Sequence, residues 1–140
     1  MKIRIKKIHE EAIVPNFAHS GDAGMDLYSV EDLILKPGER VAVSTGISAE
    51  FPEGYVALVW DKSGMALKSG IKTMAGVIDS GYRGEYKIVL TNLSPENFEI
   101  KKGQKIAQLL LQKIEVPEIE IAEELSEADR GEGGFGSTGV

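Results

Sequence analysis

Residues 76–86 have the sequence GVIDSGYRGEY, in which a polar turn that contains glycine lies between two short apolar runs. Val77 and Ile78 are β-branched, as is typical of strands. Gly81 and Gly84 supply the backbone freedom that a tight reversal of the chain needs. The pattern therefore predicts a β-hairpin.

The turn of this predicted hairpin would present an acid and an aromatic ring together. Asp79 could hold or deprotonate a water molecule, and Tyr82 offers a flat face. Gly76 has no Cβ, so a ligand could approach the backbone closely there. An ordinary surface hairpin has the same composition, and these residues alone leave both interpretations open.

Length, charge and cysteine content limit the class of protein. The chain has 140 residues, which suits one domain with a real core, and it has no cysteine, which excludes disulfides and thiolate metal sites. Its formal net charge of -6 argues against DNA or RNA as a partner, because a nucleic-acid groove needs a broad basic field. Residues 1–4 do not lead into an apolar signal core, and the chain has no long apolar segment, so we expect a soluble, cytoplasmic protein without a membrane partner.

Many short apolar runs, separated by glycine and proline turns, predict an all-β barrel or sandwich, with a jelly roll as the expected form. The nearly continuous apolar run at residues 55–60 indicates a buried strand. The expected strands are residues 3–8, 23–28, 33–35, 41–45, 55–60, 87–93, 98–100 and 105–111, with one more at residues 116–122.

Three further features each allow two interpretations. Residues 61–70, DKSGMALKSG, are either a cap with one helical turn, which would aim N–H groups and an ammonium at an anion, or a solvated loop, which the residues alone favour slightly. Gln108 is a polar group in an apolar strand, so if buried it is either a structural bridge or a ligand holder. Asp26, between apolar neighbours, is by itself more typical of a turn or strand edge than of catalysis.

The C-terminal part of the chain is polar and rich in glycine. Residues 123–129 form an acidic run that is typical of a solvated linker, and residues 130–139 contain five glycines, which predicts a disordered tail. Residues 131–136 match the letters of the G-x-G-x-x-G dinucleotide fingerprint, but that motif needs a strand before it and a helix after it, so we reject the match. Arg130 and the glycine N–H groups could still wrap a polyphosphate, and Phe135 could stack on a base.

Five stretches resemble, in order, the motifs of the trimeric deoxyuridine triphosphatases (dUTP pyrophosphatases, dUTPases). They are residues 23–27 (AGMDL), 61–66 (DKSGMA), 76–84 (GVIDSGYRG), 103–109 (GQKIAQL) and 130–139 (RGEGGFGSTG). Together the five stretches extend over nearly the whole chain, and five matches in order are not plausibly chance.

The resemblance implies hydrolysis of dUTP to dUMP and pyrophosphate by attack of water on the α-phosphorus, which keeps uracil out of DNA and supplies dUMP for thymidylate synthesis. It also implies a distorted jelly-roll β-barrel that assembles as a homotrimer, with each active site built from all three subunits and Mg²⁺ as the cofactor. Residues 1–122 would form the catalytic domain. Residues 123–140 would form a linker and a flexible, glycine-rich lid.

The resemblance assigns roles residue by residue. Asp79 would activate the attacking water, Asp26 would order Mg²⁺ through water, and Gln108 would meet the phosphates or the water as a third catalytic residue. Tyr82 would pack under the deoxyribose, and Phe135 would stack on uracil when the tail closes over the triphosphate. The substrate-binding residues would be Lys62, Ser63, Gly64, Gly76, Val77, Ile78, Tyr82, Arg130, Phe135, Gly136, Ser137 and Thr138.

The chain departs from the family pattern at two positions. Lys62 stands where the second motif usually begins with arginine, and lysine offers a point charge without the bidentate fork of a guanidinium. Thr73 stands where some relatives carry an asparagine near the base. We therefore expect the backbone around Gly76 to recognise uracil.

Two other functions compete with this interpretation. A dCTP deaminase of the same fold needs a glutamate placed at the pyrimidine ring, and residues 130–138 argue against it because they match the triphosphatase lid. A non-catalytic jelly-roll interaction protein would have no need of Asp79. Release of ammonia or of pyrophosphate, or nucleotide binding without turnover, distinguishes the three.

Overall fold

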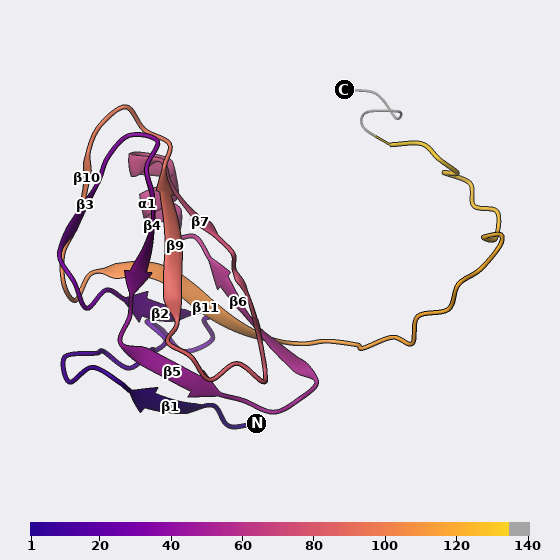
Figure 1. Cartoon of the computed structure of the whole chain (residues 1–140), viewed down its shortest axis with the longest axis horizontal. Helices are drawn as coiled ribbons and strands as arrows, with labels where there is room; N and C mark the ends of the chain where they lie inside the picture. The colour runs from indigo at the N-terminus through magenta and orange to yellow at the C-terminus, as the bar shows by residue number, and fades with distance from the viewer. Residues whose placement is uncertain (135–140) are drawn as a thin grey trace.

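Antiparallel β-strands form the body of the protein, and a computed structural model describes residues 1–134 (Figure 1). Every pairing between strands in this part of the chain is antiparallel. The prediction of a β fold is confirmed. The elements are β1 (Arg4–Lys7), β2 (Met25–Tyr28), β3 (Leu33–Leu35), β4 (Arg40–Ser44), β5 (Ile47–Glu50), β6 (Tyr55–Trp60), α1 (Ser63–Ser69), β7 (Ile71–Met74), β8 (Val77–Asp79), β9 (Lys87–Asn92), β10 (Phe98–Ile100) and β11 (Lys105–Lys113).

Strand β6 lies inside the largest sheet, whose strand order is β2-β11-β6-β8. A second sheet has the order β4-β9-β7, while β1 pairs with β5 and β3 pairs with β10. Val56, Ala57 and Val59 of β6 are buried, as the apolar run predicts for a strand inside a sheet. The largest sheet therefore determines where the residues at both ends of β6 lie.

The predicted β-hairpin over residues 76–86 is wrong. Strand β8 pairs with β6, whereas β9 pairs with β4 and β7, so residues 80–86 connect two different sheets. The backbone of Tyr86 already has partners on another part of the chain. Its N–H donates to the carbonyl of Ile47 (2.9 Å), and its carbonyl accepts from Thr45 Oγ1 (2.5 Å). These non-local hydrogen bonds replace the local pairing that the sequence pattern suggests.

The stretch at residues 61–70 forms a short helix and not the solvated loop. Helix α1 follows Lys62, which makes no side-chain capping bond. It ends at Gly70, whose left-handed φ of 62° suits glycine and whose N–H donates to the carbonyl of Ala66 (3.2 Å). Residues 63 and 64, at the start of the helix, therefore lie close to the end of β6 at Trp60.

The strand expected at residues 116–122 does not form. Strand β11 ends at Lys113, and the chain then runs away from the body of the protein, as the orange and yellow segment of Figure 1 shows. Ile119 is 90% exposed and Ile121 is 97% exposed. Alternation of apolar residues predicts a strand only where a partner strand is available, and within residues 1–134 this segment has none.

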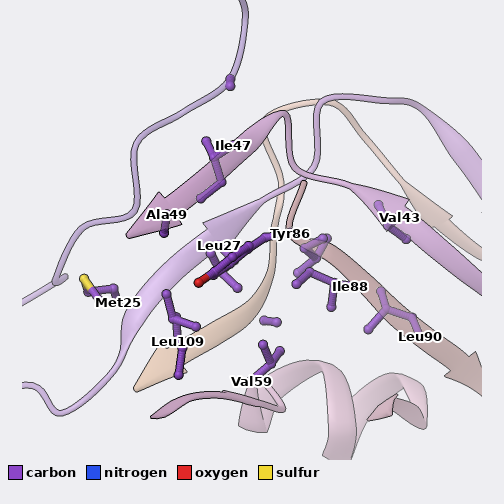
Figure 2. Packing of buried hydrophobic residues seen from close by; sticks show 14 of the residues in the cluster. Met25, Leu27, Val43, Ile47, Ala49, Val59, Tyr86, Ile88, Leu90 and Leu109 are labelled. Carbon is purple, nitrogen blue, oxygen red and sulfur yellow. The ribbon is translucent and has the colours of Figure 1, made fainter. Parts of the chain in front are cut away.

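The core lies between the sheets and draws on β2, β4, β5, β6, β9 and β11 (Figure 2). Leu27, Val43 and Leu109 have no exposed surface, and burial of such side chains stabilises the fold by about 1.5–3 kcal/mol each. Tyr86 is also buried, and its side chain points toward Leu27 in Figure 2. Its hydroxyl has no hydrogen-bond partner among residues 1–134, and burial raises its pKa to about 12.

No helix among residues 1–134 has the length and apolar character that crossing a membrane requires.

Candidate active site

A pocket of about 700 Å³ lies where β6 leads into α1, beside β2 and β11. We call it the Asp26 pocket. Its lining brings together four of the residues that the sequence predicts for the site, and it also includes Trp60, the only tryptophan of the chain. The four are Asp26, Lys62, Ser63 and Gln108.

Asp26 is a buried carboxylate between two lysines. Its side chain is 4% exposed, Oδ1 accepts a hydrogen bond from Lys62 Nζ at 2.5 Å, and Oδ2 lies 2.7 Å from Lys105 Nζ. Burial disfavours the charged carboxylate, but the hydrogen bonds and charges of Lys105 and Lys62 outweigh it and hold the pKa of Asp26 below its usual value. Asp26 is therefore ionised at neutral pH, and two cations gather around it.

Lys105 is a site residue that the sequence analysis missed. It lies in the stretch 103–109, and its register partner on β2 is Tyr28, which makes Asp26 a diagonal neighbour on the same face of the sheet, within reach of a long side chain. The register shifts between Lys105 and Ala107. Such an irregularity re-aims side chains locally, and sequence alternation does not reveal it.

Gln108 is a structural bridge, which is one of its two predicted roles. Its Nε2 donates to the carbonyl of Asp61 at 2.8 Å and so ties β11 to the end of β6. Gly24 makes room for this arrangement, because a Cβ there would come within 2.6 Å of Gln108 Oε1. Contact of Gln108 with a ligand stays a prediction.

Lys62, Ser63 and Gly64 begin the helical stretch beside Asp26. Ser63 and Gly64 are exposed, and a Cβ on Gly64 would meet no atom within 4 Å. The first N–H groups of a helix have no partner inside the helix. This corner therefore presents a hydroxyl, an ammonium and backbone donors to whatever enters the Asp26 pocket.

A second pocket of about 570 Å³ contains the predicted catalytic acid. We call it the Asp79 pocket; its lining includes Ala75, Val77, Ile78, Asp79 and Tyr82. Asp79 closes a turn in which its carbonyl accepts from the N–H of Tyr82 at 3.1 Å. The predicted base and the predicted sugar-packing ring therefore share one pocket.

Tyr82 is half exposed and folds back over the end of its own turn. Its hydroxyl donates to the carbonyl of Glu85 at 3.1 Å, and its ring centroid lies 6.2 Å from that of Tyr86. Gly84 is necessary for this fold-back, since a Cβ there would come within 2.3 Å of the Tyr82 hydroxyl oxygen. The absence of a side chain at Gly84 thus leaves space for the Tyr82 ring beside the pocket.

Gly76 has a packing role besides the one that the sequence suggests. A Cβ on Gly76 would lie 2.5 Å from the carbonyl oxygen of Val59, and the carbonyl of Gly76 accepts from the N–H of Val59 at 2.7 Å. The missing side chain therefore makes room for β6, and contact of the Gly76 backbone with a ligand stays a prediction. The preceding residue, Ala75, has a positive φ of 52°, which only a minority of non-glycine residues adopt.

The Asp26 and Asp79 pockets lie at different places on the largest sheet and share no lining residue among those that the structure describes. Asp79 is the register partner of Val56, and Gln108 is the register partner of Trp60. These two positions on β6 are about 13 Å apart along the strand, at roughly 3.3 Å per residue. Within one chain, the predicted site residues therefore form two separate groups.

A family model described as dUTPase matches residues 10–139. The chain belongs to the dUTPase family. Among its relatives is the deoxyuridine 5'-triphosphate nucleotidohydrolase of Clostridioides difficile, which is 48% identical over 139 residues, a match that covers 98% of this chain and 97% of that protein. The dUTPase resemblance drawn from the five motifs is confirmed.

Solved dUTPase structures share the fold. Staphylococcus bacteriophage 80alpha dUTPase with dUpNHpp has a TM-score of 0.91 and 32% identity, and the match covers 99% of each chain. A point mutant of the dUTPase of phage phi11 of S. aureus, in which the coordination of a structural Mg(II) ion is described, has a TM-score of 0.85 and 27% identity; that match covers 91% of this chain and 100% of the other.

The tail residues predicted from the dUTPase motifs are described only in part. Arg130 lies in the exposed segment that runs away from the body, where its Nε donates to the carbonyl of Gly133 at 2.7 Å. It meets neither pocket. Phe135, Gly136, Ser137 and Thr138 lie outside the described residues.

The donor set for a metal is small. Within residues 1–134 no three His, Cys, Asp or Glu side chains gather closely enough to hold a metal ion. Asp26 offers two hard oxygens, but each faces a lysine ammonium. Mg²⁺ usually keeps several waters and binds through one or two carboxylates plus substrate phosphates. The residues therefore fit a hydrated Mg²⁺ that is shared with phosphates, and they do not form a cage of their own.

Proposed function

We propose that this chain hydrolyses dUTP to dUMP and pyrophosphate. Membership of the dUTPase family, with curated relatives named as deoxyuridine 5'-triphosphate nucleotidohydrolases along the full chain, supports this activity. The reaction would keep uracil out of DNA and supply dUMP for thymidylate synthesis.

The Asp26 pocket would take the triphosphate. A triphosphate carries several negative charges, and Lys62 and Lys105 bring two ammonium groups to the same carboxylate. Lys62 pairs with Asp26 as a flexible point charge and can turn to a phosphate oxygen. Ser63 and Gly64 would add a hydroxyl and backbone donors.

Asp26 would hold Mg²⁺ through water in this pocket, together with phosphate oxygens of the substrate. The bound ion would neutralise charge on the triphosphate and help to fix its geometry. The Mg(II) ion described in the phage phi11 enzyme supports this cofactor.

The Asp79 pocket would take the nucleoside and the attacking water. Asp79 would accept a proton from the water as it attacks the α-phosphorus in line, with Gln108 helping to hold the phosphates or the water. Tyr82 would pack under the deoxyribose, where a 2′-hydroxyl would clash. The backbone of residues 76–78 would match the N3–H and O4 of uracil.

The observation that carries the mechanism is the separation of the two pockets on β6. Because one chain holds the phosphate residues and the catalytic acid about 13 Å apart along a strand, a second copy of the chain is the natural source of the missing half of each site. We therefore propose a homotrimer of distorted jelly-roll barrels (residues 1–122), with active sites shared between subunits. Residues 123–140 would be a linker and a lid that reaches a neighbouring site, with Arg130 and Phe135 as its contacts.

The test is release of pyrophosphate from dUTP, dCTP, dTTP and UTP in the presence of Mg²⁺, with ammonia measured in the same samples. We expect pyrophosphate from dUTP and very little from the other three. Cytosine in dCTP reverses the donor and acceptor pattern of uracil, and a mismatched buried polar edge is penalised heavily. Thymine in dTTP adds a C5 methyl for which the backbone around Gly76 would leave no room, and UTP adds a 2′-hydroxyl that would clash with Tyr82. Ammonia from dCTP would indicate a deaminase. Binding of dUTP without any product would indicate a non-catalytic protein, and either result contradicts the proposal.

A further inference from the structure

Asp61 joins three strands at the corner where β6 ends. Its Oδ1 accepts hydrogen bonds from the backbone N–H (2.6 Å) and the Oγ1 (2.7 Å) of Thr73 on β7, and its Oδ2 accepts from Lys72 Nζ (2.7 Å). Its carbonyl accepts from Gln108 Nε2 on β11 (2.8 Å). Both the side chain and the main chain of Asp61 are therefore held in place.

Asp61 lines the Asp26 pocket together with the two residues that follow it. Lys62 reaches Asp26 Oδ1, and Ser63 begins α1. Lys62 makes no side-chain capping bond, so capping does not fix the direction in which the chain enters this seven-residue helix. Asp61 supplies that orientation from outside the helix.

The bonds from Thr73 are the stronger part of this anchor. Thr73 is buried, and without Asp61 its backbone N–H would lose its partner inside the protein, which is unfavourable. The bond from Lys72 is more exposed, since the Lys72 side chain is 49% accessible, and exposed ion pairs contribute little to stability. The pKa of Asp61 agrees with this environment: burial disfavours its charge, but the hydrogen bonds from Lys72 and Thr73 outweigh burial and lower the pKa.

We propose that Asp61 is a positioning residue for the triphosphate, which acts through Lys62 and Ser63. It presets the corner between β6 and α1, so that the ammonium and the hydroxyl already face the β- and γ-phosphates when the substrate arrives. This inference rests on the proposed dUTP hydrolysis and extends it to a residue outside the expected catalytic and substrate-binding set.

The test compares two ligands that differ only in the phosphates that the corner would hold. Binding of dUpNHpp and of dUMP is measured by the fluorescence of Trp60, the only tryptophan, which lines the Asp26 pocket, and is checked by calorimetry. The variants are Asp61→Ala, Asp61→Asn and Lys72→Met. Melting temperatures confirm that each protein is folded at the assay temperature.

Asp61→Ala is expected to weaken dUpNHpp binding about 10- to 100-fold, because loss of a hydrogen bond to a charged group typically lowers affinity by about that factor. Its affinity for dUMP should stay within about twofold, since dUMP lacks the outer phosphates that the corner would hold. Asp61→Asn should restore most of the dUpNHpp affinity, because its amide oxygen can still accept both bonds from Thr73. Lys72→Met should bind both ligands as the wild type does.

Two outcomes overturn this inference but leave the proposed function standing. In the first, Asp61→Ala binds dUpNHpp as tightly as the wild type does. In the second, Asp61→Ala loses affinity for dUMP and dUpNHpp equally, which is the result expected for a purely structural residue. A wild-type protein that neither releases pyrophosphate from dUTP nor binds dUpNHpp overturns the proposed function and this inference with it. If Asp61→Ala does not fold, Thr73→Val removes one donor and keeps the shape. It should weaken dUpNHpp roughly 2- to 10-fold without changing dUMP, and no effect would contradict the inference.

Discussion

Asp79 and Gln108 lie on opposite sides of β6 and toward opposite ends of it. Asp79 on β8 is opposite Val56, while Gln108 on β11 is opposite Trp60. Within one chain, the carboxylate that would activate water at the α-phosphorus therefore lies in a different region from the residues around Asp26. This relationship leads to the central claim that each active site is shared between chains.

Asp79→Asn should keep the fold and the affinity for dUpNHpp but lose most turnover, because an amide cannot accept the proton of the attacking water. Removal of a general base typically lowers the rate about 10²- to 10⁴-fold. The measurement is kcat for pyrophosphate release, with dUpNHpp binding as the control for an intact pocket. Turnover close to that of the wild type would show that Asp79 is not the base.

Gly76→Ala should destabilise the protein, and Gly81→Ala should not. A Cβ on Gly76 would lie 2.5 Å from the backbone oxygen of Val59, and overpacking typically costs about 1–3 kcal/mol. Gly81 is in the same stretch, but a Cβ there would meet no atom within 4 Å. Urea unfolding at one fixed protein concentration measures both variants, and equal stability of the two would contradict the packing of β8 against β6.

Tyr86→Phe should stabilise the protein. The Tyr86 hydroxyl is buried without a partner in the described part of the chain, and leaving such a group unsatisfied costs about 1–3 kcal/mol. Tyr82→Phe is the matched control, because its half-exposed hydroxyl donates to Glu85 and its loss should bring no gain in stability. A lower free energy of unfolding for Tyr86→Phe than for the wild type would mean that the hydroxyl has a partner.

The advantage of Tyr86→Phe should grow in alkaline solution. Burial raises the pKa of Tyr86 to about 12, while an unfolded tyrosine titrates at about 10. As pH rises past 10 the unfolded phenol loses its proton and the folded one keeps it, so the wild type loses stability between about pH 10 and pH 12. Unfolding of both proteins at pH 9 and pH 11 tests this, since a constant difference would contradict the raised pKa.

The sequence predicts most strands correctly, because the apolar and polar residues within a segment determine whether it can form a buried or half-buried strand. The run at residues 55–60 is an example: its apolar composition predicts β6, and the structure buries it inside a sheet. The hairpin at residues 76–86 and the strand at residues 116–122 were wrong for one shared reason. A local pattern shows that a segment can be a strand, but it does not show which partner it pairs with.

Site residues that belong to a sequence motif could be predicted from the sequence. Site contacts between residues far apart in the sequence could not. Asp26, Lys62 and Gln108 lie in three separate stretches, and the structure places them in one pocket. Lys105 contacts Asp26 beside a shift in the register of β11, and Asp61 is held by a threonine on another strand. Neither contact leaves a periodic signal in the sequence.

The most direct test of the shared site mixes two inactive variants. Asp79→Asn chains and Asp26→Asn chains are unfolded together in equal amounts, refolded, and assayed for pyrophosphate release from dUTP. Each variant refolded alone provides the background, and native mass spectrometry confirms mixed trimers. The mixture is informative because each parent chain retains the half-site that the other lacks.

With random assembly into a cyclic trimer and independent sites, a site takes Asp79 from an Asp26→Asn chain half of the time and Asp26 from an Asp79→Asn chain half of the time. About a quarter of the wild-type activity should therefore return. If both halves of a site came from the same chain, no mixture could contain an intact site. Recovery of about a quarter is the result that the shared site predicts, and no recovery above background in confirmed mixed trimers would contradict it.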